Sequence, residues 1–398
     1  MAKRVARIQL PSSKLFEELT FLAKNLYNSA TYLVRQTYFE TGKIMRYYSI
    51  WNNMREKEEY IKLAERAGSH TPQQLLRMVD ATWEGYKEAK KDWRMNPEKY
   101  LGMPKIPGYL PKNGKFIVVW SEQQVRLRDG KVRIVEHLMK KGFPAIPIEK
   151  LNVNEANHSI VRLKPFYDKF ILELVYEKEL PTIKVKEEQQ ILGLDLGVNN
   201  LVATSDGLII KGGVVKSINQ FFNKQKAKIQ KQLSKQNQWT SKRKQQLMRW
   251  RYNKIHDLFH KASQIIIRHS VRKGVTTIVI GRNKNWKQNS YMGKKNNQKF
   301  TSVPFNKLIK MIQYKAEERG IVVKLVTEEY TSQTCSCCGY RSRSNRKHRG
   351  LFVCIKCKLV INADVNAAIN IAKKAFPESL NGIGDSGRVT QPTKLIAL

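Results

Sequence analysis

Four of the five cysteines in this 398-residue chain form two C-x-x-C pairs, which strongly restrict how the surrounding segment can fold. The pairs are Cys335-Ser-Cys-Cys338 and Cys354-Ile-Lys-Cys357, separated by fifteen residues. This spacing allows two tight turns to supply four thiolates to one tetrahedral Zn²⁺ ion. Because four thiolates leave no open coordination position, we expect this zinc to fold the loop and not to catalyse. Cys337 is either a spectator or a replacement for a neighbour.

A disulfide or a redox dithiol is the competing interpretation, and it would require a thioredoxin-like βαβ pattern around the pairs. The sequence shows no such pattern. Because no cysteine lies elsewhere to staple a secreted fold, a reducing cytosol is the expected compartment. No run of about 18 apolar residues occurs, so neither a membrane span nor a membrane partner is expected.

The charge of the chain points to a polyanionic partner. Lysine and arginine number 73 against 33 aspartate and glutamate residues, which gives a formal net charge of +40. A surface that is basic for solubility alone needs a net charge of only about 2 to 8. Nucleic acid is therefore the expected partner, well ahead of an anionic membrane surface.

The first hundred residues predict one strand followed by long helices. Residues 5–10 alternate in the manner of a strand, and apolar residues at helical spacing begin near Ser13. Thr71 and Gln74 predict a capping box at the start of a further helix, with Pro72 at its first position. These apolar stripes are interpreted as a helical core.

A small β-structure is predicted over residues 105–180. Alternating apolar residues flank Asp129-Gly130, a dipeptide typical of tight hairpin turns, and residues 170–176 alternate again. We interpret this region as a β-barrel or sandwich with the helices inserted after its first strand. Residues 181–188 have the composition of a linker.

From residue 189 the pattern becomes α/β. The predicted elements are a strand at 191–196, a hairpin at 201–210 turning at Asp206-Gly207, strands at 275–280 and 321–326, and a helix at 305–319 that ends at Gly320. Three strands paired as a meander, followed by alternating helices and strands, is the order of an RNase H-type fold.

Residues 223–254 contain no acidic residue, and two tryptophans are interleaved with many lysines and arginines. Most charge runs are solvated surface, but a run of one sign over about nine helical turns favours a helical pair that follows phosphates. The residues expected to bind nucleic acid are Lys224, Lys228, Lys231, Lys235, Lys242, Arg243, Arg249 and Arg251.

The segment His256-Asp-Leu-Phe-His260 imitates the H-E-x-x-H motif of zinc proteases, with aspartate in place of glutamate. It lies at the end of the basic run, and no third ligand is evident. We therefore favour a histidine pair on one helix face near bound nucleic acid.

Two aspartates are candidates for catalysis. Asp195 lies inside an apolar strand, where its charge is costly to bury unless a cation compensates it. Asp364 opens a small-residue helix after the cysteine segment. Each has a simpler interpretation, since Asp195 can stabilise a turn and Asp364 can cap a helix. Paired across an RNase H-type sheet, both would become ligands of a two-metal phosphodiesterase.

The motifs around Asp195, the cysteines and Asp364 resemble those of the TnpB family encoded by insertion sequences, which is related to the type V CRISPR effectors. The quoted stretches are Gly-Leu-Asp195-Leu-Gly-Val, Tyr330-Thr-Ser-Gln-Thr-Cys-Ser-Cys-Cys-Gly and Asp364-Val-Asn-Ala-Ala. The resemblance implies an RNA-guided, Mg²⁺-dependent endonuclease that cuts target double-stranded DNA beside a short adjacent motif. It implies a guide RNA from the transposon end, and we expect one protein monomer in the RNA complex, acting in the prokaryotic cytoplasm at the nucleoid.

One position departs from that family. Members usually carry a catalytic glutamate at the end of the fourth strand, where this chain has Gly281. Some members supply the acid from the next strand, and Glu328 fits that place. Strands one, four and five of the fold are parallel, so their C-terminal ends lie at one edge. Glu329 is expected to point the other way. Asp195, Glu328 and Asp364 are thus the expected catalytic residues and Mg²⁺ ligands.

The resemblance implies a multidomain α+β chain with an oligonucleotide-binding-type barrel, an inserted helical recognition domain and a RuvC-like nuclease domain with an inserted zinc ribbon. The expected boundaries are 1–10 and 103–182 for the barrel, 11–102 for the recognition domain, 189–330 and 359–376 for the nuclease domain, 331–358 for the ribbon, and 377–398 for a disordered tail. Two alternatives stay open: a nuclease-dead, RNA-guided DNA-binding repressor, and a guide-independent transposase or junction nuclease.

Overall fold

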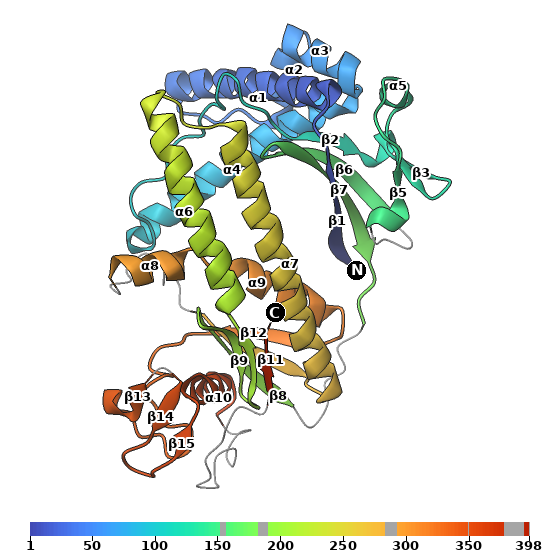
Figure 1. Cartoon of the computed structure of the whole chain (residues 1–398). Coiled ribbons are helices and arrows are strands. Elements are labelled where there is room, and N and C mark those ends of the chain that lie inside the picture. Colours follow the sequence, from blue (N-terminus) through green and yellow to red (C-terminus); the bar gives the residue numbers. More distant parts are fainter. Residues whose placement is uncertain (152–156, 182–189, 283–292, 349, 378–393, 398) are drawn as a thin grey trace. The chain divides into compact units, whose positions relative to one another are not determined.

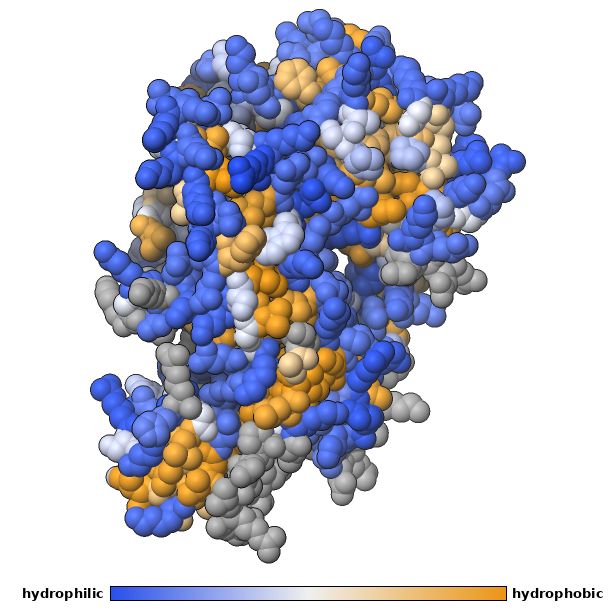
Figure 2. All heavy atoms as spheres, in the orientation of Figure 1, coloured by the Kyte–Doolittle hydropathy of each residue, from blue (hydrophilic) through white to orange (hydrophobic). Residues whose placement is uncertain are grey.

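The computed structural model describes all residues except 152–156, 182–189, 283–292, 349, 378–393 and 398 (Figure 1). The linker predicted at 181–188 falls almost entirely outside the described residues. The chain has a mixed α/β architecture and divides into an N-terminal unit, Met1–Glu179, and a C-terminal unit, Leu180–Leu398. Hydrophilic residues make up most of the visible surface (Figure 2). None of the described helices is long and apolar enough to cross a membrane.

A four-stranded antiparallel sheet forms one layer of the N-terminal unit. Its strand order is β1-β7-β6-β2, with bounds β1 Ala2–Leu10, β7 Lys169–Lys178, β6 Asn157–Phe166 and β2 Val118–Ser121. Strand β1 pairs with β7 along its whole length, from Ala2 opposite Lys178 to Leu10 opposite Phe170. The predicted insertion of the helices after the first strand is therefore confirmed.

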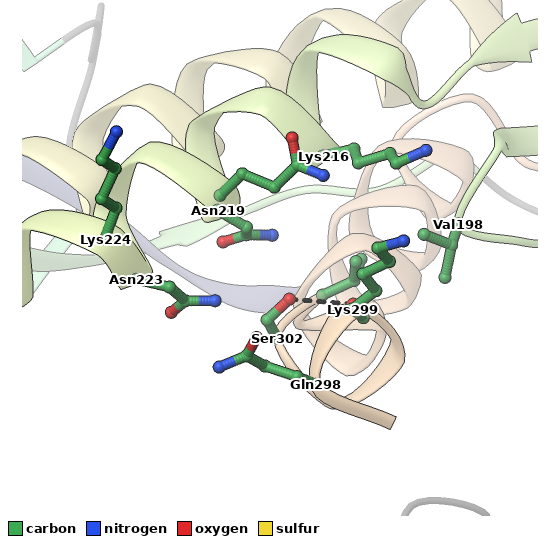
Figure 3. A pocket seen from close by; sticks show the side chains of 10 residues that line it. Val198, Lys216, Asn219, Asn223, Lys224, Gln298, Lys299 and Ser302 are labelled. Atoms are coloured by element: carbon green, nitrogen blue, oxygen red, sulfur yellow. Dashed lines mark hydrogen bonds between the residues drawn. The ribbon is translucent and has the colours of Figure 1, made fainter. Parts of the chain in front are cut away.

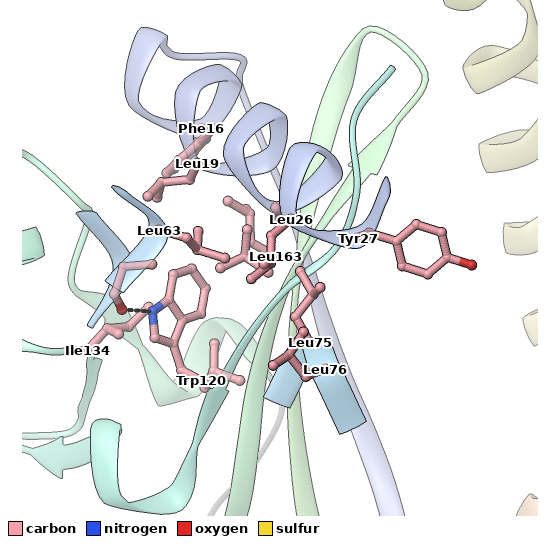
Figure 4. Close-up of a cluster of buried hydrophobic side chains, with 14 of the residues drawn as sticks. Phe16, Leu19, Leu26, Tyr27, Leu63, Leu75, Leu76, Trp120, Ile134 and Leu163 are labelled. Atoms are coloured by element: carbon pink, nitrogen blue, oxygen red, sulfur yellow. Dashed lines mark hydrogen bonds between the residues drawn. The ribbon is translucent and has the colours of Figure 1, made fainter. Parts of the chain in front are cut away.

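The inserted helices pack on this sheet through one hydrophobic core. They are α1 Lys14–Thr41, α2 Tyr47–Met54, α3 Glu58–Ala67 and α4 His70–Met95. The predicted start of α1 is confirmed, because the Ser13 side chain accepts a hydrogen bond from the Phe16 amide. At the centre of the core, the fully buried Trp120 donates from its indole nitrogen to the Ala67 carbonyl at the end of α3, over 3.0 Å (Figure 4).

The predicted capping box at Thr71 is wrong. Helix α4 already begins at His70, so Thr71 and Pro72 lie inside its first turn. The Thr71 hydroxyl is buried and donates to the Ala67 carbonyl over 3.1 Å and to the Gln124 side chain over 3.4 Å. Because Thr71 lies within the helix and no side-chain hydrogen bond caps the start of α4, its hydroxyl does not serve as an N-terminal cap.

Between β2 and β6 the chain forms a separate small sheet of order β3-β4-β5, together with a short helix. Their bounds are β3 Arg126–Arg128, β4 Lys131–Arg133, α5 Glu136–Lys140 and β5 Ile146–Pro147. The predicted hairpin turn is confirmed, since Asp129 and Gly130 both have positive φ, 53° and 63°. Within the described ranges of the chain, 3₁₀ turns occur at Pro97–Lys99, Glu122–Gln124, Ile148–Leu151 and Arg343–Asn345.

A six-stranded sheet of order β12-β11-β8-β9-β10-β16 organises the C-terminal unit. Its strands are β8 Ile191–Leu196, β9 Asn200–Thr204, β10 Leu208–Lys211, β11 Thr277–Gly281, β12 Val322–Val326 and β16 Lys394–Ile396. Strand β8 pairs in parallel with β11, which pairs in parallel with β12, whereas β9 is antiparallel to both β8 and β10. All the strands predicted for this part of the chain are present.

The expected disorder of residues 377–398 is wrong for Lys394–Ile396. These residues form β16, which pairs in parallel with β10, Leu395 lying opposite Ile209. Strand β10 would otherwise be a sheet edge with unpaired backbone groups, and such an edge accepts a further strand. Residues 378–393 lie outside the described part of the chain.

Helices cover both faces of this sheet. They are α6 Gly213–Lys235, α7 Lys242–Arg272, α8 Lys294–Thr301, α9 Phe305–Glu317 and α10 Ala363–Ala375. Leu192, Leu194 and Leu196 of β8 join the core formed with α7 and α9. The alternate residues of β8 face α10, because a methyl group added at Gly193 would meet Ala368 of that helix. Asp195 therefore lies on the α10 side.

The segment between β12 and α10 carries the cysteines and a three-stranded sheet of order β13-β14-β15. The strands are β13 Arg346–His348, β14 Leu351–Val353 and β15 Val360–Ile361. Phe352, Cys335 and Cys354 are buried in a core that also contains Ala203 and Ile209 of the large sheet. The cysteine segment thus packs against one face of that sheet, at β9 and β10.

We predict that Gly193→Ala lowers the melting temperature, because the added methyl would overlap the Ala368 backbone oxygen and push α10 away from β8. Overpacking of this kind typically costs about 1–3 kcal/mol. Gly213→Ala is the matched control, since no atom lies within 4 Å of a methyl added there. Calorimetry that finds the two variants equally stable would contradict the tight packing.

Candidate functional site

Cys335, Cys338, Cys354 and Cys357 come together as one group whose sulfur atoms all lie within 4.8 Å of one another. The sulfurs of Cys335 and Cys357, and those of Cys338 and Cys354, are 3.5 Å apart. Zinc–sulfur bonds of about 2.3 Å in a tetrahedron place sulfurs about 3.8 Å apart, so the four thiolates fit a metal such as zinc. Exposed Cys337 lies outside the group, which makes it a spectator.

The two cysteine pairs adopt the same local structure. Each pair is followed by a residue in the left-handed region, Gly339 with φ 71° and Lys358 with φ 60°. The amides of these residues donate back to the carbonyls of Cys335 and Cys354, both over 3.0 Å. Each C-x-x-C segment is thus a tight turn that directs two sulfurs to the same point.

We predict one zinc ion per chain, measurable by elemental analysis of fully reduced protein. Cys354→Ser should remove it and unfold the cysteine segment locally, because Cys354 is buried and would be one of the four ligands. Cys337→Ser is the control and should keep both the zinc and the melting temperature. Loss of zinc in both variants, or no zinc in the unmutated protein, would refute this assignment.

Asp195, Glu328 and Asp364 line one open cavity of about 650 Å³. Asp195 is near the C-terminal end of β8, Glu328 follows β12 by two residues, and Asp364 lies in the first turn of α10. The three predicted acids therefore meet at one edge of the sheet, where the parallel strands end. In the described part of the chain, the cysteines are the one set of three or more ligand atoms within 4.8 Å. The carboxylates share the cavity without converging on a single point.

Asp364 is held by two side chains that the sequence analysis did not identify. Its carboxylate accepts a hydrogen bond from the Asn200 amide over 2.7 Å and forms an ion pair with Arg346 over 3.3 Å. The cap of α10 is Asn362, whose side chain accepts from the amides of Asp364 and Val365. The alternative interpretation of Asp364 as the helix cap is therefore wrong, and its carboxylate is directed into the cavity.

Glu328 occupies the space above Gly281. A methyl group added at Gly281 would lie 2.5 Å from Cγ and 2.9 Å from Oε1 of Glu328. Only glycine at the end of β11 therefore leaves room for the Glu328 side chain in this position. Glu329 is exposed and does not line the cavity, as expected from the alternation of side chains.

Burial raises the pKa values of Asp195 and Glu328, and repulsion by neighbouring carboxylates adds to the shift of Asp195. Burial is the larger cause for Asp195, and the neighbouring charges of Asp364 and Glu328 add to it, raising its pKa to about 8. Burial raises the pKa of Glu328 to about 7, opposed by the ammonium group of Lys374. Such carboxylates become charged at neutral pH most readily when cations bind beside them.

We predict that the metal-free protein loses stability through Asp195 as the pH rises from about 4 to about 8. Over this interval the folded state retains a proton that the unfolded chain, with an aspartate pKa of about 3.9, has released. Asp195→Asn cannot ionise and removes this loss. In thermal unfolding with a chelator, its advantage over the unmutated protein should therefore grow with pH.

Asp257→Asn, an exposed position on α7, is the control for this experiment and should show no growing advantage. An advantage of Asp195→Asn that is constant between pH 5 and pH 8 would contradict the raised pKa of Asp195.

Two asparagines one helical turn apart bind the cysteine segment to α10. Asn366 accepts from the Ser336 amide over 2.9 Å and donates to the Thr334 carbonyl over 2.9 Å. Asn370 donates to the carbonyls of Thr331 and Thr334. The i, i+4 spacing in Asn366-Ala-Ala-Ile-Asn370 was the available signal for this contact. Through it, the helix that carries Asp364 is fixed to the segment that carries the four clustered cysteines.

The predicted basic helical pair consists of α6 and α7, which lie side by side (Figure 1). The side chains of Lys224, Lys228, Lys231, Lys235, Lys242 and Arg243 are exposed on it, and Arg249 is half-buried. Arg251 differs from the expectation. Its guanidinium donates to the Asn219 side chain over 2.8 Å and to the Ser302 carbonyl over 2.6 Å. These donors are used within the protein, so we assign Arg251 a positioning role.

His256 and His260 lie in contact on one face of α7, their ring centroids 4.5 Å apart. The Lys315 ammonium donates to the His260 carbonyl, and burial followed by the charge of Lys315 lowers the pKa of His260. Neither histidine belongs to a metal-binding group among the described residues. We therefore retain the interpretation of His256 and His260 as a histidine pair on one helix face, in preference to a zinc-protease motif.

Two family models match the chain on either side of residue 300. The model of the OrfB_IS605 family, described as "Probable transposase", matches residues 173–287, which include Asp195. The model described as "Cas12f1-like, TNB domain" matches residues 305–371, which include Glu328, Asp364 and the four clustered cysteines.

A TnpB-like protein of Methanocaldococcus jannaschii is 26% identical over 284 residues, covering 70% of this chain and 88% of the relative. InsQ of Escherichia coli, named as a candidate RNA-guided DNA endonuclease, is 28% identical over 223 residues. That match covers 51% of this chain and 53% of InsQ, so the chain spans about half of that relative. The solved structure of the mini-RNA-guided endonuclease CRISPR-Cas_phi3 is 12% identical, with a TM-score of 0.50 over 94% of this chain and 92% of that chain. This last likeness concerns the fold alone.

Proposed function

We propose that this chain, a relative of the TnpB-like proteins, is an RNA-guided, Mg²⁺-dependent DNA endonuclease that cuts target DNA beside a short adjacent motif. The observation that carries the proposal is the meeting of Asp195, Glu328 and Asp364 in one cavity at the C-terminal edge of the sheet. The order β10-β9-β8-β11-β12, with β9 antiparallel, agrees with a RuvC-like domain of the RNase H type.

The donor set of this cavity suits a hard divalent cation, because Mg²⁺ prefers carboxylate oxygens and water. Burial raises the pKa values of Asp195 and Glu328, and cations bound beside these two carboxyl groups would favour their charged forms. Mg²⁺ bound there would supply Lewis acidity and an activated water for phosphodiester hydrolysis. The three carboxylates would hold the ions, and Asn200 and Arg346 fix the orientation of Asp364.

Guide RNA and target DNA are the proposed partners. The net charge of +40 and the exposed lysines of α6 and α7 suit a long polyanion, whose binding releases counterions. In such complexes base pairing by the guide reads the sequence, and the protein holds the backbones. We propose one protein molecule per RNA complex, acting in the prokaryotic cytoplasm at the nucleoid.

We assign the domains in the same terms. The strands at 1–10 and 103–182 are proposed as the oligonucleotide-binding-type barrel, and 11–102 as the helical recognition domain inserted in it. The nuclease domain is proposed at 189–330 and 359–376, with the zinc ribbon at 331–358 between its two parts. Under this proposal the chain has two different metal sites. The carboxylates would bind an ion that prefers oxygen ligands, such as Mg²⁺, and the four cysteines would bind zinc.

A nuclease-dead, RNA-guided binder is the second candidate, and Gly281 is the observation that favours it. The Glu328 side chain fills the space at Gly281, however, so an acid is present where the family pattern expects one. A guide-independent transposase or junction nuclease has no specific support beyond the shared sheet order.

We predict that Glu328→Gln abolishes guided cleavage of a matched plasmid while target binding stays within about twofold. Glutamine keeps the packing over Gly281 and removes the charge that would bind a cation. Cleavage is measured with Mg²⁺ on gels, and binding by filter retention. Glu329→Gln is the control, because the exposed Glu329 does not line the cavity.

Normal cutting by Glu328→Gln would disprove the role of this residue. An unmutated protein that binds guided targets but never cuts them would establish the binder instead.

A further inference from the structure

A second cavity borders the candidate active site. It has a volume of about 450 Å³ and lies between α6 and the α8 segment (Figure 3). Val198, Lys216 and Lys299 line both this cavity and the one that holds the three acids. The two cavities therefore adjoin, and a chain of phosphates can extend from one into the other.

The wall of the second cavity contains a buried hydrogen-bond donor in fixed orientation. Asn219 is only 4% exposed, and its Oδ1 accepts from Nε of Arg251 over 2.8 Å. The same guanidinium also donates to the Ser302 carbonyl over 2.6 Å, which fixes Arg251, the partner of Asn219, in place. Since Oδ1 is taken by Arg251, Nδ2 is the donor that remains, and it has no hydrogen-bond partner in the structure. Figure 3 shows this nitrogen on the cavity side. A buried donor of this kind requires an acceptor.

The charge around this donor is positive. Lys216, Lys224 and Lys299 line the cavity, and no acidic residue lines it. None of these three lysines forms an ion pair with an acid in the described part of the chain. The matching ligand must carry several acceptor oxygens and negative charge, which is the chemistry of a phosphate group.

We propose that this cavity binds a phosphodiester of the DNA strand that is being cut, next to the phosphate at the three acids, with Asn219 Nδ2 as a donor to it. The proposal rests on the proposed function, because it takes the neighbouring cavity as the place of cleavage. The shared wall favours the cut strand over the guide RNA, whose backbone has no need to enter the acidic cavity. Asn219 binds the strand, and Arg251 is a positioning residue that orients its amide.

The variant Asn219→Asp tests this donor with little risk to the fold. Aspartate has the same shape, and it keeps an acceptor for Arg251 and adds a favourable charge to that pair. It replaces the Nδ2 donor by an oxygen that repels phosphate. With the guide RNA complex and saturating matched DNA, we expect the single-turnover cleavage rate to fall at least tenfold. Binding of the guide and of the target should be unchanged. The control is Asn237→Asp, the same substitution in the exposed turn between α6 and α7, which should cut normally.

A scan with single methylphosphonate linkages separates a phosphate contact from a structural effect. Each linkage in turn loses its charge and an acceptor oxygen. In the unmutated protein, one linkage beside the cut should slow cleavage, and in Asn219→Asp the same linkage should have no further effect. Equal sensitivity of both proteins at every linkage would overturn the proposal.

A direct measurement decides the case if the unmutated protein does not cut. Crystals of the protein soaked with the tetranucleotide dT4 should show a phosphate within hydrogen-bond distance of Asn219 Nδ2, and Asn219→Asp crystals should not. An oligonucleotide bound elsewhere with this cavity empty would overturn the phosphate site. Absence of cutting with phosphate bound at Asn219 would overturn the proposed function alone.

Discussion

The close contact between β8 and α10 determines where two of the candidate catalytic acids, Asp195 and Asp364, lie. Gly193 precedes Asp195 by two residues, about 6.6 Å along a strand, and Ala368 follows Asp364 by four residues, about 6 Å along a helix. Gly193 packs on Ala368, and each acid lies about the same distance from this contact. Asp195 and Asp364 therefore reach the same cavity. A second glycine, Gly281, leaves the space in which Glu328 reaches them.

Three carboxylates in one cavity repel one another, and this repulsion disfavours the folded state. The surrounding residues compensate the three negative charges to different degrees. Arg346 and Asn200 compensate Asp364, whereas burial and the neighbouring carboxylates hold the pKa of Asp195 at about 8. Arg346 comes from the cysteine segment, which Asn366 and Asn370 bind to α10. The cysteine group is therefore connected to the proposed nuclease site by one helix, α10.

Local patterns predicted most of the strands and helices, because alternation, helical spacing and turn dipeptides act over few residues. The β8 strand, the Asp206-Gly207 turn and the four clustered cysteines were found in this way. Contacts between segments that are distant in sequence were not predictable. The Thr71 hydroxyl hydrogen-bonds to Ala67 and to Gln124, and β16 pairs with β10, which lies far from it in the sequence. Asn219 and Arg346 were missed for the same reason, and no local pattern marks either residue.

The central claim is that Asp195, Glu328 and Asp364 together bind divalent cations. Anomalous diffraction from crystals soaked in Mn²⁺, recorded on both sides of the manganese absorption edge, tests it most directly. The claim predicts manganese at about 2.2 Å from carboxylate oxygens of all three residues, and no manganese signal at the four cysteines. A cavity without manganese, or manganese bound by Asp195 and Asp364 with Glu328 turned away, would contradict the account.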